Sequence, residues 1–364
     1  SPEDKVDASL DSHITIKSGK FHIVAGGSRQ KGAGAAGGIA GYLFASAPLS
    51  HCVNYGDVTS GKTWAGGIVG NSYRAPVSVV NSVNYGNITA TTTHAGGIIG
   101  NLIAATDSTA NTLSHLENHG VIQAGGNYSG GIVGQMGSYG TLSHASNYAP
   151  VTAKGNYAGG IGGNVSSETL ISQCRNSASV KGAIYVGGIA GQNMGSISDS
   201  QNDGDITGAG KYTGGIAGAS AGSLTVCVNS GTISGAEYTG GVIGSNAAAN
   251  GMGNVQQCVS SGLVVTSGTP FGGVIGYSNG RGNIEANYFD ASVNNMDGCS
   301  SLSQGFNGVS TSELVTATVP EGLDKEKFQF SATAYPTLKA FANETAGIAQ
   351  RSIYVLFGKG EKRT

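Results

Sequence analysis

A short glycine motif recurs nine times along this chain of 364 residues: Gly-Gly, an aliphatic residue, any residue, and a third glycine. Consecutive copies begin 26 to 34 residues apart. A repeat of this length indicates a stack of supersecondary units, each too small to bury its apolar face alone. The copies begin at Gly37, Gly66, Gly96, Gly130, Gly159, Gly187, Gly214, Gly240 and Gly272.

Each repeat also carries apolar residues at regular positions. In the repeat that begins at Gly187 they are Ile189, Ile197 and Ile206, and the matching positions elsewhere hold Ile, Val or Leu. Short segments of such residues between glycines favour strands over helices. We therefore predict an all-β fold, a three-sided parallel β-solenoid of nine to ten coils with terminal caps. At about 4.8 Å per coil, nine coils form a rod of roughly 40–45 Å.

Breaks in the repeat divide the chain into segments. We expect an N-terminal cap and first coil at 1–36, solenoid repeats at 37–290, a C-terminal capping segment at 291–345, and a terminal strand and tail at 346–364. The last segment is alternatively the start of a following domain. Ile14–Ile16, Phe21–Val24 and Ser352–Phe357 read as strands, and Ser310 predicts the start of a short helix near 311–317. We expect 290–341 to fold over the last coil, since an open solenoid end exposes strand edges.

An asparagine stands five residues after the second apolar position in seven consecutive repeats. Asn-x-Gly is typical of turns, because Gly tolerates positive φ and Asn bonds local backbone. Stacked amides can also bond one another. We therefore predict a structural ladder formed by Asn54, Asn84, Asn118, Asn147, Asn176, Asn202 and Asn229.

An aromatic residue or histidine stands two residues before the Gly-Gly pair in seven repeats. Stacked rings that face outward would offer a platform for the apolar faces of sugars. Alternatively, the rings pack a corner of the coil, and strand alternation does not decide between the two because the chain bends at Gly-Gly. The candidate ligand-binding residues are Trp64, Tyr128, Tyr157, Tyr185, Tyr212 and Tyr238, with His94 in the same file.

The insertions that vary in length fall between the Gly-Gly pair and the second apolar position; the longest are Asn101–Thr112 and Ser245–Asn254, and Asn71–Pro76 is a lesser one. Variable loops on a rigid scaffold commonly carry binding sites. These loops are rich in Ala, Ser and Asn, so simple tolerance of insertion explains them equally well.

Together these positions resemble the GLUG-repeat family, whose unit runs Gly-Gly-aliphatic-x-Gly and then aliphatic-x-x-Cys/Ser-x-Asn-x-Gly-x-aliphatic-x-Gly. The copy from Gly187 through Ile197, Ser200, Asn202 and Ile206 is most similar, and the resemblance covers residues 37–290. The family occurs in bacterial secreted and surface proteins, including adhesin-like proteins and immunoglobulin-A-cleaving metallopeptidases. The resemblance implies an accessory extracellular module. The peptidase activity does not carry over, because none of the seven histidines is followed by Glu, as the His-Glu-x-x-His zinc motif requires.

Composition argues against several functions. The formal net charge is −2 and charged residues make up 11%, so no basic surface predicts nucleic-acid binding. No apolar run is long enough to span a membrane. The five cysteines show no CxxC spacing, and we expect no metal or cofactor. The densest acidic cluster is Asp199, Asp203 and Asp205, near Arg175 and Lys181 in the preceding coil.

The sequence therefore leads to a hypothesis with alternatives. We expect a non-catalytic structural or adhesion module, a stalk or ligand-presenting scaffold, at the bacterial cell surface. Its partners would be a host glycan or a host or bacterial surface protein, and we expect a monomer. The alternative is a glycan-binding or glycan-cleaving β-helix, a polysaccharide lyase or hydrolase, using the Tyr file or the Asp199–Asp205 patch. A further alternative is self-association through an end or an edge.

Overall fold

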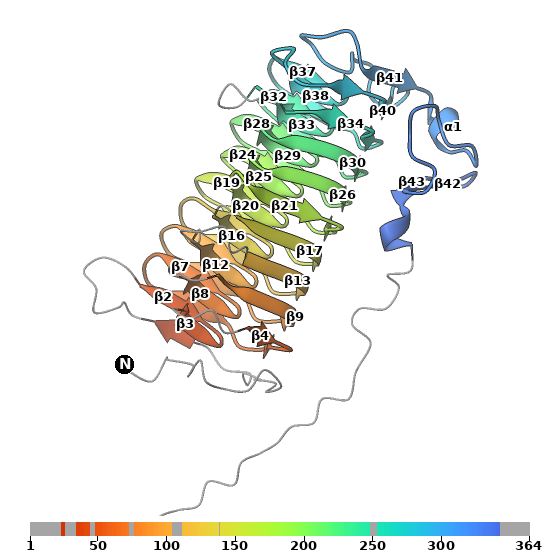
Figure 1. Cartoon of the computed structure of the whole chain (residues 1–364). Helices are drawn as coiled ribbons and strands as arrows, with labels where there is room; N and C mark the ends of the chain where they lie inside the picture. Colours follow the sequence, from red (N-terminus) through yellow and green to blue (C-terminus); the bar gives the residue numbers. More distant parts are fainter. Residues whose placement is uncertain are drawn as a thin grey trace, which may run out of the picture.

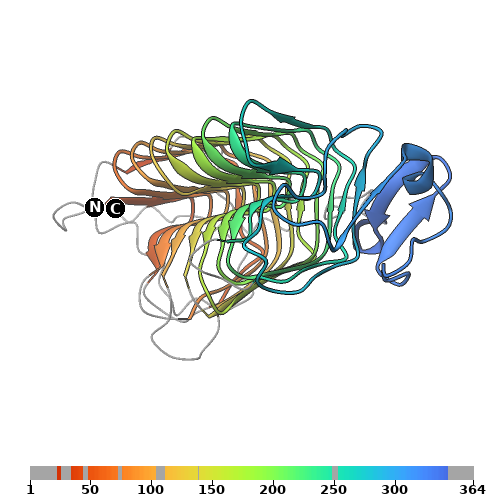
Figure 2. The same ribbon diagram turned by 90° about the horizontal axis from the view of Figure 1, so that it is seen from above.

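The computed structural model describes residues 23–25, 34–43, 48–72, 76–103, 111–137, 139–247 and 253–342. Figure 1 shows coils stacked along one axis, with the C-terminal segment (blue) beside the stack. Figure 2, seen from above, shows each coil following the outline of the one before. The parallel β-solenoid predicted from the repeats is confirmed.

Each coil contributes to four parallel sheets, which we number in the order in which the chain enters them. Sheet 1 consists of β1 (Ile23–Ala25), β6 (Val58–Ser60), β10 (Ile88–Ala90), β14 (Ile122–Ala124), β18 (Val151–Ala153), β23 (Val180–Gly182), β27 (Ile206–Gly208), β31 (Ile233–Gly235) and β36 (Val264–Thr266). Sheet 2 consists of β2 (Ala35–Gly37), β7 (Trp64–Gly66), β11 (His94–Gly96), β15 (Ser129–Gly130), β19 (Asn156–Gly159), β24 (Ile184–Gly187), β28 (Lys211–Gly214), β32 (Glu237–Gly240) and β37 (Phe271–Gly272).

The other two sheets follow the Gly-Gly bend. Sheet 3 consists of β3 (Ala40–Leu43), β8 (Val69–Ser72), β12 (Ile99–Leu102), β16 (Val133–Met136), β20 (Gly162–Val165), β25 (Ala190–Asn193), β29 (Ala217–Ser220), β33 (Ile243–Ser245) and β38 (Ile275–Tyr277). Sheet 4 consists of β4 (Leu49–Ser50), β5 (Val53–Asn54), β9 (Ser78–Asn84), β13 (Asn111–Asn118), β17 (Gly140–Asn147), β21 (Thr169–Ser172), β22 (Arg175–Asn176), β26 (Ser196–Asn202), β30 (Ser223–Asn229), β34 (Val255–Gln256), β35 (Val259–Ser260), β39 (Ile284–Glu285), β40 (Asn287–Asp290) and β41 (Phe306–Val309).

Residues at the same position of consecutive repeats are also the residues that pair between neighbouring strands. Ile88 pairs with Val58 on one side and with Ile122 on the other, and the remaining apolar files pair in the same way. Two details differ from the expectation. The described sheets 1 to 3 each hold nine strands, so the chain makes about eight full turns between the first and the last. The coil has four sheets instead of the expected three sides. The sequence shows one apolar position at the Gly-Gly motif, but the chain bends there, and one strand of sheet 2 ends before the bend while one strand of sheet 3 begins after it.

The interior holds two apolar cores with the asparagine amides between them. One core lies between sheets 3 and 4 and the other between sheets 1 and 2. The amide of each ladder asparagine packs against the second glycine of its own coil: a Cβ added to Gly67 would lie 2.6 Å from Cγ of Asn84, and one added to Gly131 would lie 2.7 Å from Oδ1 of Asn147. The Gly-Gly pair and the asparagine are therefore two halves of one packing arrangement.

The segment expected to cover the last coil divides in two. Residues near Gly298 continue the coil, since the amides of Val274 and Ile275 donate to the Gly298 carbonyl, and β41 pairs with β40. The chain then turns through α1 (Thr311–Leu314), the antiparallel pair β42 (Phe328–Ser331) and β43 (Ala334–Leu338), and the 3-10 helix η3 (Lys339–Phe341). These elements lie on the outer face of sheet 4, beside β26 and β30, and not over the end (Figure 1).

Local signals explain these last elements. The N-cap Ser310 donates its backbone N–H to the Glu313 carboxylate at 2.7 Å, and the predicted short helix is confirmed, although it ends at Leu314. The burial of Phe328, Leu338 and Phe341 against Val228 and other sheet 4 residues holds the segment in place. The predicted strands Ile14–Ile16 and Ser352–Phe357 lie outside the described residues, as do parts of the three insertions.

Candidate functional site

The aromatic residues before the Gly-Gly pairs form one continuous stack, which we call the ring column. Successive ring centroids from His94 to Tyr238 lie 4.5 to 5.0 Å apart. Successive ring planes from Tyr128 to Tyr212 differ by at most 8°, and the plane of Tyr238 is tilted by 33° from that of Tyr212. Trp64 adds a tilted ring 6.2 Å from His94. The column therefore runs parallel to the solenoid axis.

This geometry determines which part of each ring meets solvent. Because the rings stack along the axis, each face is covered by the next ring, and the half-exposed residues present their edges and hydroxyl groups. A sugar therefore has no room to lie flat on a ring within the column. Burial, and then the neighbouring Tyr128 and Tyr185, raise the pKa of Tyr157, so its hydroxyl stays protonated near neutral pH.

The backbone of the ring column is unusual. Tyr128, Tyr157, Tyr185, Tyr212 and Tyr238 have φ between 54° and 65°. This left-handed conformation costs about 1–2 kcal/mol for a residue with a Cβ. Each aromatic pair contributes about 0.5–1.5 kcal/mol beyond its buried area. Ring stacking thus offsets a backbone conformation that would otherwise favour glycine.

A second column faces the rings across the Gly-Gly bend. The third glycine of each motif brings the backbones together: a Cβ added to Gly163 would lie 2.8 Å from the carbonyl oxygen of Tyr157, and one added to Gly191 would lie 2.7 Å from that of Tyr185. The residue after that glycine begins a paired file in sheet 3, which we call the amide column. Its members are Asn71, Asn101, Gln135, Asn164 and Gln192, with Tyr42 before them and Ala219, Ser245 and Tyr277 after them.

Direct contacts join the two columns. Nε2 of His94 lies 2.7 Å from Oε1 of Gln135, and the ring of Tyr42 meets Trp64 edge-on at 6.0 Å. At the other end Tyr277 meets Tyr238 edge-on at 5.9 Å. The columns therefore lie side by side, and we call the strip of surface between them the crease.

Sequence reasoning missed a second ring column. Tyr55, Tyr85, His119 and Tyr148 stack with centroids 4.8 to 5.1 Å apart, and Tyr85 is 46% exposed. Each residue directly follows a ladder asparagine, so the same repeat alignment could have revealed it. A further pair, His115 and His144, stacks at 4.7 Å.

The seven asparagines hydrogen-bond in sequence from coil to coil. Nδ2 of each of the first six donates to Oδ1 of the next, at 2.7 to 2.8 Å, and Nδ2 of all seven donates to a carbonyl oxygen two residues along its own chain. Each of these side chains is fully buried. A buried amide bonded on both sides contributes to structure and is not available to a ligand.

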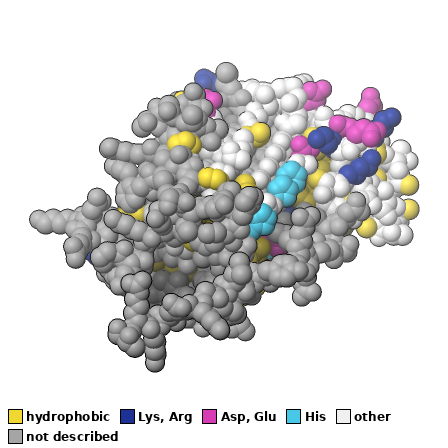
Figure 3. All heavy atoms as spheres, turned by 60° about the horizontal axis from the view of Figure 1, so that its bottom comes forward, with side chains coloured by type: hydrophobic (Ala, Val, Ile, Leu, Met, Phe, Trp, Pro, Cys, Tyr) yellow, Lys and Arg dark blue, Asp and Glu magenta, His cyan; other side chains and the backbone are white. Residues whose placement is uncertain are grey.

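The acidic cluster does not converge on a common point. Asp203 accepts from Nε of Arg175 at 2.7 Å, Asp199 pairs with Lys327 at 2.9 Å, and Asp205 accepts the Thr232 N–H at 3.0 Å. In Figure 3 most of the acidic (magenta) and basic (dark blue) side chains visible among the described residues lie toward the right of the view. Asp199 and Asp203 are thus engaged in ion pairs, and Asp205 in a backbone hydrogen bond.

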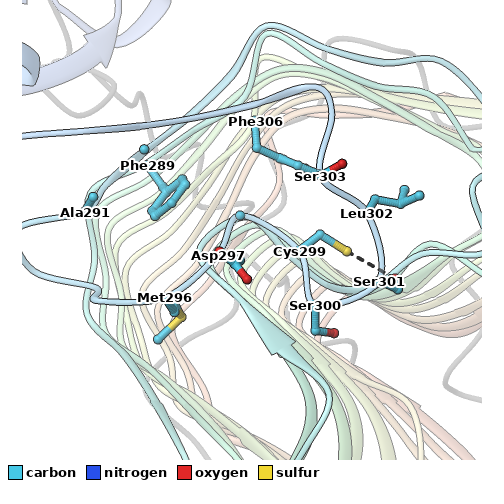
Figure 4. A pocket seen from close by; sticks show the side chains of 12 residues that line it. Phe289, Ala291, Met296, Asp297, Cys299, Ser300, Ser301, Leu302, Ser303 and Phe306 are labelled. Carbon is cyan, nitrogen blue, oxygen red and sulfur yellow. Dashed lines mark hydrogen bonds between the residues drawn. The ribbon is translucent and has the colours of Figure 1, made fainter.

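An open hollow of about 620 Å³ lies where the solenoid ends. Figure 4 shows Phe289, Cys299 and Phe306 around it, with the coils behind. The Cys299 thiol lies 3.3 Å from the Ser301 hydroxyl. Its lining mixes aromatic, sulfur and serine groups without a charged pair, so it shows no catalytic arrangement.

Among the described residues, no three His, Cys, Asp or Glu side chains lie together as a metal site. No helix of the described part has the length and hydropathy needed to cross a membrane. All five cysteines are buried and unbridged.

Comparison with known proteins supports the identification of the repeat as the GLUG motif. The family profile of the GLUG motif matches residues 182–207. A crystal structure described as a putative immunoglobulin A1 protease from Bacteroides ovatus is similar, with 14% identity, a TM-score of 0.39, and coverage of 88% of this chain and 74% of that one. No curated protein matches the chain. The chain is thus a β-solenoid that contains the GLUG motif, as its repeat pattern indicated.

Proposed function

We propose that this chain is a non-catalytic extracellular module of a bacterial surface protein, acting as a stalk or as a scaffold that presents ligands. The observation that supports this proposal most is the unbroken stacking. Nine strands in each of three sheets, paired in register, make a stiff body about 40 Å long. Such a body holds its ends at a fixed separation, which is what a stalk requires.

We propose no catalysis because the acidic and amide side chains that could form a site are already engaged in ion pairs and hydrogen bonds within the solenoid. The carboxylates of the Asp199–Asp205 cluster bond Arg175, Lys327 and a backbone amide, and the ladder amides bond one another. A glycan-cleaving site needs two carboxyl groups placed on either side of the scissile bond. Carboxylates held by structural partners would first have to give up those partners.

A display experiment tests the proposal. Bacteria that carry the chain on a heterologous outer-membrane anchor are compared with bacteria that carry the anchor alone. We expect the displayed chain to increase adhesion to host cells, or to hold a fused binding domain farther from the cell surface. Removal of residues 187–213, one whole repeat, should preserve the fold and shorten that reach by about 5 Å.

Two results would contradict the proposal. One is a displayed chain that changes neither adhesion nor reach. The other is release of reducing ends or unsaturated sugars from a polysaccharide by the purified chain, with loss of that activity in Asp203→Asn. The second result would favour the glycan-cleaving alternative.

A further inference from the structure

The middle of the crease combines partly exposed polar side chains from both columns. Gln135, Asn164 and Gln192 are half-exposed there, whereas Asn71 and Asn101 are buried and bonded to each other at 2.8 Å. Beyond Gln192 the amide column gives way to Ala219 and Ser245, both buried. The accessible amides therefore span three successive coils.

The rings beside these amides present hydroxyl groups. Among the described residues, no hydrogen bond joins the hydroxyls of Tyr128, Tyr157 or Tyr185 to protein, and none of these hydroxyls is enclosed. The side-chain oxygen of Asn164 is enclosed and lacks a partner in the described part of the chain, so the amide NH₂ is the end of this side chain that can reach a ligand. Each coil level thus offers one phenol hydroxyl, which both donates and accepts, and one amide NH₂, which donates.

The repeat of these groups along the axis limits what can bind. Ring centroids from Tyr128 to Tyr212 lie 4.9 to 5.0 Å apart. An extended peptide advances 3.2–3.4 Å per residue and falls out of step within a few residues. A linear polysaccharide advances by about one sugar ring per unit, close to one coil. These three levels of the two columns carry no ionisable carboxylate, amine or guanidinium.

We propose that this part of the crease binds a neutral linear glycan that runs along the solenoid axis, with about one sugar unit per coil. The proposal rests on the adhesion function proposed above and gives it a ligand class. Sugar hydroxyls bond the edges of the columns, at Tyr157 and Tyr185 on one side and Asn164 and Gln192 on the other. This arrangement differs from a flat ring platform, which the stacking of the rings does not allow.

The probes are neutral linear oligosaccharides of two to six units, from gluco-, xylo- and manno-series, tested on an array and then by titration calorimetry. Affinity should rise up to three or four units and then level off. Tyr157→Phe with Tyr185→Phe keeps the ring stack but removes two hydroxyls, and should lower affinity at least about fivefold. Asn164→Ala with Gln192→Ala should act similarly.

Matched controls carry the same changes elsewhere. Tyr85→Phe changes an exposed ring of the second ring column, and Gln123→Ala removes an exposed side chain on sheet 1. Both should leave the affinity for the oligosaccharides unchanged, and circular dichroism checks that each variant folds. The proposal is overturned if no neutral oligosaccharide binds, if the control variants weaken binding as much as the crease variants, if a disaccharide binds as tightly as a hexasaccharide, or if anionic polymers or peptides bind in preference. Adhesion of displaying bacteria without glycan binding would remove this inference and leave the proposed function standing.

Discussion

Asn147, in the middle of the asparagine ladder, is the side chain whose removal should weaken the solenoid most clearly. Its Nδ2 donates to Oδ1 of Asn176 at 2.8 Å and to the Ala149 carbonyl at 2.9 Å, while its Oδ1 accepts from Asn118 at 2.8 Å. The residue is fully buried. Asn147→Ala therefore leaves a donor, an acceptor and a carbonyl without partners, where water does not replace them.

The expected loss follows from these partners. A buried polar group left unsatisfied costs about 1–3 kcal/mol. With two neighbouring amides affected, and some relaxation of the coil, we expect a destabilisation of about 3–5 kcal/mol. Asn229 ends the ladder, because Ser260 occupies the next level, and it bonds only one other asparagine. Asn229→Ala should cost about 2 kcal/mol.

Urea denaturation followed by far-UV circular dichroism measures these losses, provided that the slope with urea stays constant. The matched control is Asn87→Ala, which removes an exposed amide that accepts one backbone N–H from Val121 at 3.0 Å. It should cost about 1 kcal/mol or less. If Asn147→Ala costs no more than Asn87→Ala, the ladder does not stabilise the solenoid and the reasoning is wrong.

Three further predictions follow. Gly160→Ala should prevent normal folding, because the new Cβ would overlap the carbonyl oxygen of Gly188 and the Asn176 amide. Soluble yield and circular dichroism check this against Gly162→Ala, whose Cβ would meet only side-chain atoms, the nearest at 3.0 Å, and whose partner in the next coil is Ala190. Burial lowers the pKa of His94 to about 4, so between about pH 6.5 and pH 4 the unfolded chain binds a proton that the folded chain does not. The free energy of unfolding should therefore fall as pH drops from about 6.5 towards 4, and the melting temperature of His94→Phe should depend less on pH in this range. Phe328→Ala should loosen the C-terminal segment by about 3–5 kcal/mol, whereas Lys327→Ala should cost less than about 1 kcal/mol, and hydrogen exchange in β42 and β43 distinguishes the two.

The repeat made some parts of the fold predictable. Because one repeat is one coil, residues at equal positions pair between neighbouring strands, as Ile88 does with Ile122. The asparagine positions could be found in the same way. The number of sheets could not, because two strands meet at the Gly-Gly pair and strand periodicity is lost at the bend.

The candidate site was harder to predict. The file from Trp64 to Tyr238 was visible in the sequence, but not the direction in which its ring faces point. Nor was Gln135 marked as its neighbour, since the two columns come together through contacts such as that between Gly163 and the Tyr157 carbonyl. The C-terminal segment lies against sheet 4 through Phe328 and Lys327, whose partners stand far earlier in the sequence.

The amino-acid sequence alone determined that this chain stacks equivalent side chains along one axis. A fixed spacing between repeats is visible in the sequence, and it places the same position of each repeat above that of the repeat before. The tertiary structure decided what each file of side chains faces. That depends on the angle at each glycine bend, which is set by contacts between backbones on either side of it. The crease between rings and amides is a product of those contacts, and it carries the binding site that we propose.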